Sequence, residues 1–464
     1  MPWWRMKKRI NRGRVRFAHQ QGILARLQTT PDNRAQMIQP SFQSPARGSA
    51  VSAVLLAVLA TLLSGCGEPP WNNPHPPRGD DLLTYQSVMT PAPPKHLDPA
   101  VSYASDEALF IMQIYEPPMS YHFLKRPYEL IPGALAAFPD VTYLDAAGEP
   151  VGEESEALAY TRYTLRLRED LHYQPHPAFA TNADGEPSYL FADAAEGATY
   201  RSIPDFPKLG DRPVRANDYV YAIKRLADPL AGSPMLGFMS QYIVGMREFS
   251  AELADQSRDS WLNLDDFPMA GLEVLDDRTL TISIIGRYPQ FVFWLAMPFF
   301  SPVAPEVDRF YHNPGFAERN LTLDWWPVGS GPFMMVKNDP NSEVVLERNP
   351  NYREEFFPVE GAPGDLEAGF LDDAGKPVPF IDRAVFRLEK EVLPLWTKFL
   401  QGYYDRSGEV HGNTNGVFDQ AFVVGPDGVE VSEELAEHAI TMSPDVKPGI
   451  YYYGFNMRDP VVGG

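Results

Sequence analysis

The stretch PVGSGPFMMVKNDPNSEVVLERNPNY, residues 327–352, begins with a run of turn-forming residues. Gly329, Gly331 and Pro332 predict a turn that leads into a strand, because glycine and proline favour turn conformations. The segment EVVLE that follows is typical of a strand, and the tripeptide NPN at 349–351 predicts the turn that ends it. We therefore expect this stretch to enter a strand through one turn and to leave the strand EVVLE through another.

Strand signals continue on both sides of this stretch. The segment LLTYQSVM at 82–89 predicts the first strand of the globular part. Residues 162–168 alternate polar and apolar side chains, which is typical of a half-buried strand. The segment LEVLDDRTLTISI at 272–284 predicts a hairpin that turns at Asp276 and Asp277.

A helix is predicted between these strands, within RANDYVYAIKRLADP at 215–229. Asp218 suits its first turn and Pro229 ends it. Its apolar residues recur at helical spacing on one face: Val220, Ile223, Leu226 and Ala227. The irregular alternation of strands and helices predicts a mixed α/β (α+β) protein. The 46 prolines, about twice the usual share, indicate many loops and short elements.

Cys66 is the only cysteine, and it follows an apolar run at 50–63. That run is too short to span a bilayer, which takes about 20 residues, but it has the length and basic flank of a signal-peptide core. The sequence LSGC at 63–66 resembles a bacterial lipobox, in which the cysteine thiol is alkylated by a diacylglycerol. Free cysteine is also a common core residue. Position and uniqueness favour a lipid anchor on Cys66.

The segment before Met37 is rich in Arg and Lys and contains a single acid, Asp32. It could be a nucleic-acid-binding arm. We favour the simpler interpretation, in which translation starts near Met37 and the upstream residues are not part of the natural protein.

Cleavage before Cys66 would leave 30 basic and 60 acidic residues, a net charge of −30. Affinity for nucleic acid comes largely from cationic contacts to phosphates, so we expect no nucleic-acid partner. The charge favours solubility of an exported protein. The proline-rich segment at 66–81 predicts an extended tether between the anchor and the folded part.

Motifs for catalysis, nucleotide binding and zinc binding are absent from the sequence. His172 and His176 stand four residues apart, but Pro175 and Pro177 exclude the helix that would place them on one face. We therefore expect no metal site, no cofactor and no enzyme activity, and we interpret the two histidines as part of a solvated loop. The aromatic stretches at 291–300 and 451–455 are interpreted as core.

Seven segments occur in the order found in family 5 of the bacterial extracellular solute-binding proteins, the oligopeptide- and dipeptide-binding lipoproteins of ABC importers, and the sequence resembles that family. The segments are LDPA (97–100), IYEPP (114–118), RPVRANDYVYAIKRLADP (212–229), GLEVLDDRTLTISI (271–284), the opening stretch (327–352), FIDRAVFRL (380–388) and YYYGFN (451–456). Arg215 stands where the family usually has a capping Thr or Ser, and the loops at 170–211 and 353–380 are longer than in commoner members.

The resemblance implies a type II periplasmic-binding-protein fold with two lobes that close on a ligand. It divides the chain into a signal region (1–65), the tether (66–81), a first lobe (82–118 and 305–464) and an inserted subdomain (119–304). The family pattern continues into a second lobe after the YYYGFN strand, so we expect that lobe, which we interpret as missing here, to follow Gly464.

The resemblance also implies a ligand site. In peptide binders of this type, an extended segment shortly after the LDP motif pairs with the main chain of the ligand, which gives affinity without reading side chains. Here it comprises residues 101–105, and we expect Tyr103, Ala104 and Ser105 to contact the ligand. The alternative is an ordinary surface loop.

The implied partners are a peptide, an ABC permease in the inner membrane, and the membrane that holds the lipid. We expect a monomer on the periplasmic or outer side of the cell envelope. A sugar or metal-chelate ligand stays open, as does a structural or partner-binding role in the envelope or an unrecognised enzyme.

Overall fold

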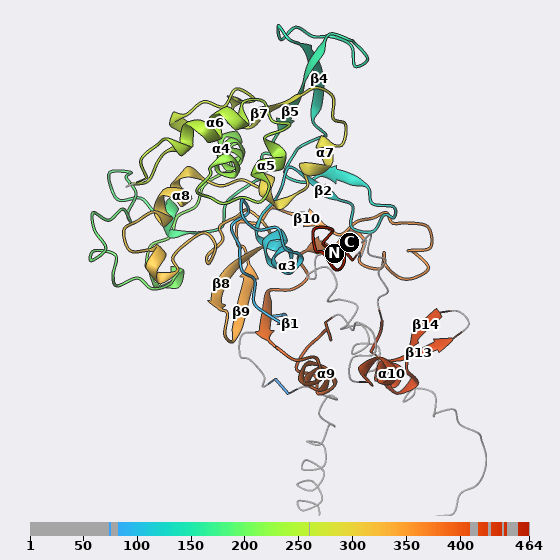
Figure 1. Cartoon of the computed structure of the whole chain (residues 1–464). Helices are drawn as coiled ribbons and strands as arrows, with labels where there is room; N and C mark the ends of the chain where they lie inside the picture. Colours follow the sequence, from blue (N-terminus) through green and yellow to red (C-terminus); the bar gives the residue numbers. More distant parts are fainter. Residues whose placement is uncertain are drawn as a thin grey trace, which may run out of the picture. The chain divides into compact units, whose positions relative to one another are not determined.

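A computed structural model of the chain describes residues 74–75, 82–258, 260–408, 416–425, 428–438, 440–442 and 453–463 (Figure 1). The described residues up to 408 belong to one compact unit, and those from 416 onward belong to a second. Cys66, the signal region and all of the predicted tether except Pro74 and His75 lie outside the described residues.

The first sheet of the larger unit contains the predicted strand at 82–89 and the predicted strands of the stretch at 327–352. Its order is β1–β12–β9–β8, with β1 parallel to β12 and the other pairs antiparallel. Helix α3 (Ser105–Ile114) packs against it, and the Phe110 ring meets the Phe386 ring at 4.8 Å. The strands are β1 (Thr84–Met89), β8 (Phe333–Asp339), β9 (Glu343–Arg348) and β12 (Arg383–Leu388).

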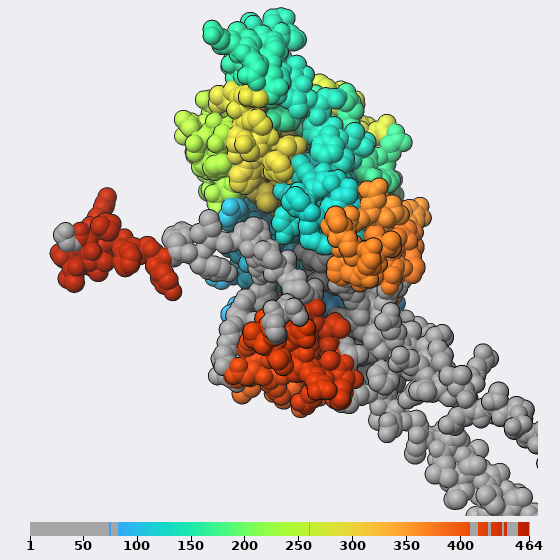
Figure 2. Space-filling model, turned by 90° about the vertical axis from the view of Figure 1, so that its right-hand side faces the viewer, coloured from blue at the N-terminus to red at the C-terminus, as the bar shows by residue number. Residues whose placement is uncertain are grey.

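A second, antiparallel sheet has the order β4–β5–β7–β6. Helix α4 (Ala216–Ala227) packs on β6 and β7, and α6 (Met246–Ala254) packs on α4. The loop joining β4 to β5 protrudes as the blue-green knob at the top of Figure 2. The strands are β4 (Asp140–Asp145), β5 (Leu158–Arg166), β6 (Leu272–Asp276) and β7 (Thr279–Ile285). The predicted hairpin at 272–284 and the predicted helix are confirmed.

Short elements complete the described chain. The two-stranded sheets are β2 (Met119–Tyr121) with β3 (Leu130–Pro132), β10 (Glu355–Phe356) with β11 (Pro377–Val378), and β13 (Phe422–Gly425) with β14 (Gly428–Val431). The further helices are α5 (Leu236–Met239), α7 (Phe291–Trp294), α8 (Pro305–Tyr311), α9 (Val392–Leu400), α10 (Val417–Ala421) and α11 (Glu433–Glu437). Single 3₁₀ turns lie at Pro177–Phe179, Ile203–Asp205, Leu264–Asp266, Pro298–Phe300 and Ala317–Arg319. The mixed α/β class is confirmed.

The glycines of the opening stretch are required by a close backbone approach. A Cβ atom on Gly329 would lie 2.0 Å from the carbonyl oxygen of Ile114, at the end of α3, and one on Gly331 would lie 2.7 Å from the same oxygen. The Gly331 N–H donates to that oxygen at 2.8 Å. The predicted turn therefore leads into β8 and joins it to α3.

Arg215 does not cap α4 with its side chain, and the neighbouring Asp218 supplies the cap. The Asp218 carboxylate accepts a hydrogen bond from the Arg215 N–H at 2.8 Å and also binds the Arg212 guanidinium at 2.7 and 2.8 Å. An acid in the first turn satisfies a free N–H group and complements the helix dipole. The helix therefore keeps a cap although Thr or Ser is absent.

Both long loops fold onto the larger unit. In the loop at 170–211, the Tyr200 ring stacks on the Phe206 ring at 4.1 Å, and Phe206 meets Phe310 of α8 at 5.3 Å. The loop at 353–380, orange in Figure 2, lies beside the segment between β2 and β3. There Phe357 meets Phe123 at 5.3 Å, and buried Asp365 forms an ion pair with Arg126.

Two interpretations of the sequence need correction. His176 does not lie in a solvated loop, because it is 1% exposed and its ring is packed between Phe179 and Phe310. The stretch at 291–300 is largely core, as predicted, but Tyr453 and Phe455 are 96% and 71% exposed. The core interpretation is wrong for these two residues, since only a local turn surrounds them in the described part of the smaller unit.

Candidate ligand-binding segment

The segment at 101–105 connects the LDP motif to α3. Tyr103, Ala104 and Ser105 are all exposed, and Tyr103 retains 63% of its surface. Ala104 has extended backbone angles (φ −81°, ψ 149°) and precedes the first helical residue, Ser105. The structure therefore brings the three predicted contact residues to the surface next to one another.

Asp98 makes the tight turn that starts this segment. Its carbonyl oxygen accepts hydrogen bonds from the N–H groups of Val101 and Ser102 at 3.0 and 2.8 Å. Its carboxylate accepts a third from Ala100 at 3.0 Å. Short acidic side chains commonly stabilise turns in this way.

Glu107, in the first turn of α3, holds the other end of the segment. One carboxylate oxygen, Oε2, accepts from the Ser102 hydroxyl at 2.8 Å and from the N–H groups of Tyr103 and Ala104 at 3.1 Å each. Oε1 accepts from the His96 N–H at 3.0 Å. Burial raises the pKa of this 3% exposed carboxyl, but the hydrogen bonds from Ser102 and the backbone outweigh it and the pKa lies below its usual range. Glu107 is therefore a carboxylate at neutral pH.

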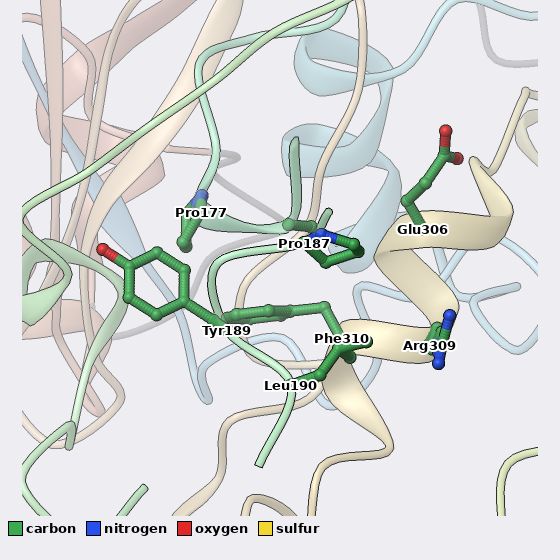
Figure 3. A pocket seen from close by; sticks show the side chains of 8 residues that line it. Pro177, Pro187, Tyr189, Leu190, Glu306, Arg309 and Phe310 are labelled. Atoms are coloured by element: carbon green, nitrogen blue, oxygen red, sulfur yellow. The ribbon is translucent and has the colours of Figure 1, made fainter. Parts of the chain in front are cut away.

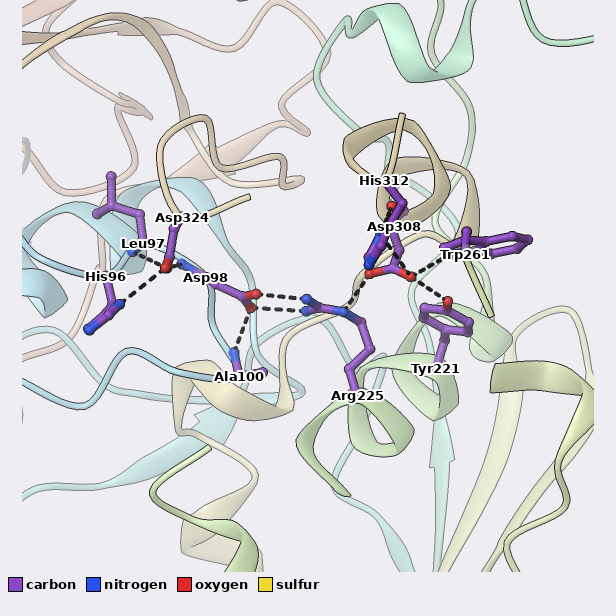
Figure 4. A network of polar contacts seen from close by, with 10 residues as sticks. All are labelled: His96, Leu97, Asp98, Ala100, Tyr221, Arg225, Trp261, Asp308, His312 and Asp324. Carbon is purple, nitrogen blue, oxygen red and sulfur yellow. Dashed lines mark hydrogen bonds and ion pairs between the residues drawn. The ribbon is translucent and has the colours of Figure 1, made fainter. Parts of the chain in front are cut away.

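A buried charge network joins the turn at Asp98 to α4 and α8 (Figure 4). Arg225 of α4 binds both carboxylate oxygens of Asp98 at 2.7 and 2.9 Å, and its Nε donates to Asp308 of α8 at 2.9 Å. Asp308 also accepts from the Tyr221 hydroxyl at 2.8 Å and the Trp261 indole at 2.7 Å. Two of the motif segments, LDPA and the α4 stretch, thus meet through charged side chains.

Asp324 anchors the residues just before the turn. Its Oδ1 accepts from the N–H groups of Leu97 and Asp98 at 3.2 and 3.1 Å, and its Oδ2 lies 3.1 Å from Nδ1 of His96 (Figure 4). Sequence reasoning missed Asp324, Arg225 and Glu107 because their partners are distant or backbone groups.

A small pocket, with a volume of about 50 Å³, lies between the 170–211 loop and α8 (Figure 3). It is lined by Pro177, Ala178, Pro187, Tyr189, Leu190, Glu306, Arg309 and Phe310. Its two charged residues are already engaged, Glu306 with Arg212 at 2.7 Å and Arg309 over the Trp261 ring at 5.4 Å. We assign no ligand to it.

The part of the chain that the structure describes contains no group of three or more His, Cys, Asp or Glu residues arranged to hold a metal ion. It also contains no helix of the length and hydropathy needed to cross a bilayer. His172 pairs with Asp211 at 3.4 Å, while both ring nitrogens of His176 have other partners.

Comparison with known proteins identifies the family to which these sequence motifs belong. Residues 210–463, more than half of the chain, match the family described as "Bacterial extracellular solute-binding proteins, family 5 Middle". The chain belongs to this family. Membership supports the type II periplasmic-binding-protein fold expected from the sequence, and the matched region includes α4, the hairpin of β6 and β7, and the stretch at 327–352.

Several known proteins are similar to this chain over part of their length. The chain is 25% identical over 217 residues to the dipeptide-binding protein DppE of Bacillus subtilis, covering 46% of this chain and 34% of the relative. It is 27% identical over 184 residues to the periplasmic oligopeptide-binding protein OppA of Salmonella typhimurium, covering 37% and 30%. A third relative, 26% identical over 143 residues, is the probable deoxycholate-binding periplasmic protein YgiS of Escherichia coli, with coverage of 31% and 24%. The aligned part thus spans about a third or less of each curated relative.

Solved structures of similar proteins also match. A periplasmic oligopeptide-binding protein from Borrelia burgdorferi gives a TM-score of 0.43 at 17% identity, covering 69% of this chain and 46% of that one. OppA of Haemophilus influenzae, solved with the peptide RPPGFSPFR, gives a TM-score of 0.41 at 17% identity, covering 70% and 45%.

Proposed function

We propose that this chain is part of a lipid-anchored solute-binding protein that captures peptides outside the inner membrane and delivers them to an ABC permease. Family membership supports the solute-binding role, and relatives named as dipeptide- and oligopeptide-binding proteins support the ligand class. The observation that carries the proposal is the exposed run from Tyr103 to Ser105, in which Ala104 has extended backbone angles and which Asp98 and Glu107 hold in place.

The proposed organisation follows the family pattern. Residues 1–65 would be removed as a signal region, Cys66 would carry the lipid, and residues 66–81 would form the tether. Residues 82–118 and 305–464 would build the first lobe, with 119–304 as an inserted subdomain. A second lobe would close over the ligand from the opposite side, and the mature protein would act as a monomer in the periplasm.

Tyr103, Ala104 and Ser105 are the proposed contacts with the ligand. Main-chain hydrogen bonding would give affinity for peptides of many sequences, which suits a transporter of nutrients. A second candidate is an amphipathic solute other than a peptide, because a relative of similar identity is named as a probable deoxycholate-binding protein.

The test is a melting assay on the protein isolated from its own cells, with mixed tri- and tetrapeptides and, separately, deoxycholate. A ligand at 100 times its dissociation constant stabilises a fold by about 2.7 kcal/mol, which is easily measured. We expect a peptide-dependent rise in melting temperature. A rise with deoxycholate alone would favour the second candidate, and no rise with either would contradict both.

Recombinant residues 66–464 serve as the comparison. Tyr103 is 63% exposed in the described chain, so these residues offer one wall to a ligand and exclude little water from it. We expect no peptide-dependent shift for this form. Saturable peptide binding by residues 66–464 would show that closure by a second lobe is unnecessary.

A further inference from the structure

Every backbone N–H group from His96 to Ala104 donates a hydrogen bond inside the protein, Pro99 having none to give. Carboxylates accept six of them: His96, Tyr103 and Ala104 donate to Glu107, Leu97 and Asp98 to Asp324, and Ala100 to Asp98. The remaining two, from Val101 and Ser102, go to the Asp98 carbonyl. The segment therefore has no donor left over this range.

Most carbonyl groups at the end of the same segment, in contrast, have no hydrogen-bond donor among the described residues. The Ala104 carbonyl accepts from the Ala108 N–H at 3.1 Å, as the first bond of α3. Those of Val101, Ser102 and Tyr103 accept no hydrogen bond from any residue that the structure describes. A ladder between two strands uses donors and acceptors on both sides, so a segment of this kind can form only half of one.

We propose that Glu107 is a positioning residue for the ligand: by binding the N–H groups of Tyr103 and Ala104, it leaves the main chain of the segment with free acceptors and no free donor, and this main chain therefore selects N–H groups of the ligand. This inference rests on the proposed function of the segment. Glu107 also decides which groups of the ligand are favoured at the N-terminus of α3. The N-terminus of a helix ordinarily attracts carboxylates, but at α3 that place is taken by Glu107 itself, with Asp106 beside it. A ligand carboxylate is thus disfavoured there, and peptide N–H or ammonium groups are favoured.

The experiment uses the protein isolated from its own cells and its Glu107→Gln variant, with Asp106→Asn as the matched control. Gln has the length of Glu, but its NH₂ group must replace one carboxylate oxygen and then faces a donor from which that oxygen accepts a hydrogen bond. Asp106 is an exposed acid in the same helical turn with no contact to the segment among the hydrogen bonds described. The probes are tetra-alanine and its three analogues in which one peptide N–H is replaced by an ester oxygen.

The expected result has two parts. Hydrogen exchange at the Tyr103 and Ala104 amides becomes at least tenfold faster in Glu107→Gln and is unchanged in Asp106→Asn. At least one ester analogue binds the natural protein tenfold or more weakly than tetra-alanine, and this difference shrinks severalfold in Glu107→Gln. A purely structural role would lower all affinities together and leave the difference between amide and ester intact. If Glu107→Gln folds poorly, Ser102→Ala removes a single hydrogen bond to Oε2 and is expected to give a smaller change of the same kind.

The contrary results are separable. If the natural protein binds tetra-alanine and binds every ester analogue equally well, the claim that the segment selects N–H groups of the ligand is wrong. If an ester analogue binds more weakly than tetra-alanine by the same factor in the natural protein and in Glu107→Gln, Glu107 does not position the contact. If the natural protein binds no peptide at all, the proposed function fails and this inference fails with it, while the exchange rates still report whether Glu107 orders the segment.

Discussion

Both ring nitrogens of His176 have partners, and together they define its protonation state. Nδ1 accepts from the Ala178 N–H at 3.2 Å, so it carries no proton. Nε2 lies 3.1 Å from the Tyr311 hydroxyl, which itself donates to the Trp326 carbonyl at 2.5 Å. Nε2 is therefore the donor, and the buried ring is neutral. Burial lowers the pKa of His176 to about 3.

This buried histidine predicts a pH dependence of stability. Below its ordinary pKa of about 6.5, the unfolded chain binds a proton that folded His176 does not, so stability falls as pH falls from 6.5 toward 3. We expect a loss of about 2 kcal/mol at pH 5 relative to pH 7.5 from this residue. His176→Asn keeps an acceptor for the Ala178 N–H and should remove that part of the loss.

Urea unfolding of the recombinant chain at pH 7.5 and pH 5 measures the effect. His172→Asn is the control, because that ring is partly exposed and pairs with Asp211. The prediction is wrong if the free energies of unfolding of the parent and His176→Asn change in parallel between the two pH values.

At the scale of elements, α4 is held by charge as well as by apolar contacts. Arg225 connects α4 to the LDP turn through Asp98 and to α8 through Asp308, and side-chain exposure of all three is 10% or less. A buried charge that loses its partner is destabilising by about 3–5 kcal/mol. We expect Arg225→Met to cost about this much, because it leaves two carboxylates without a counter-ion.

Unfolding in urea, with two comparisons, tests this role. Arg287 pairs with Glu153 at 2.5 Å on the surface, where solvent screens the interaction, so Arg287→Met should cost much less than Arg225→Met. Adding Asp98→Asn and Asp308→Asn to Arg225→Met should recover part of the stability, since the uncompensated charges are then removed. A cost below 1 kcal/mol for Arg225→Met alone would contradict the role given to the network.

The same helix illustrates what periodicity can and cannot predict. Spacing located α4 and its apolar residues, but the structure buries Asp218, Lys224 and Arg225 as well. Their partners, such as Arg212 and Asp98, are set by the fold, and the helical pattern carries no trace of them. The turn at Gly329 was likewise predictable from composition, whereas its contact with Ile114 depends on a residue more than 200 positions away.

For the whole molecule, the predicted contact segment was located by family resemblance alone. Composition and spacing single out no residue between the LDP motif and α3, because an exposed loop carries no periodic signal. What the structure adds is the reason for its shape: the Glu107 carboxylate binds its backbone donors, and the carboxylates of Asp98 and Asp324 bind those of the residues just before it. The division into lobes stays a prediction.

A lipid on Cys66 would determine the place of the protein in the cell. If this residue is the lipid anchor, Cys66→Ser should abolish incorporation of labelled fatty acid and leave an uncleaved precursor, because the thiol is the atom that is alkylated. Stable attachment requires two or more acyl chains, since a single chain binds a membrane only reversibly. Labelling with an acyl probe in cells, followed by intact-mass measurement, reports both outcomes. Gly67→Ala, which changes the next residue and keeps the thiol, should retain the label. Acyl incorporation into Cys66→Ser would end the lipoprotein hypothesis, and the tether at 66–81 would then need another role.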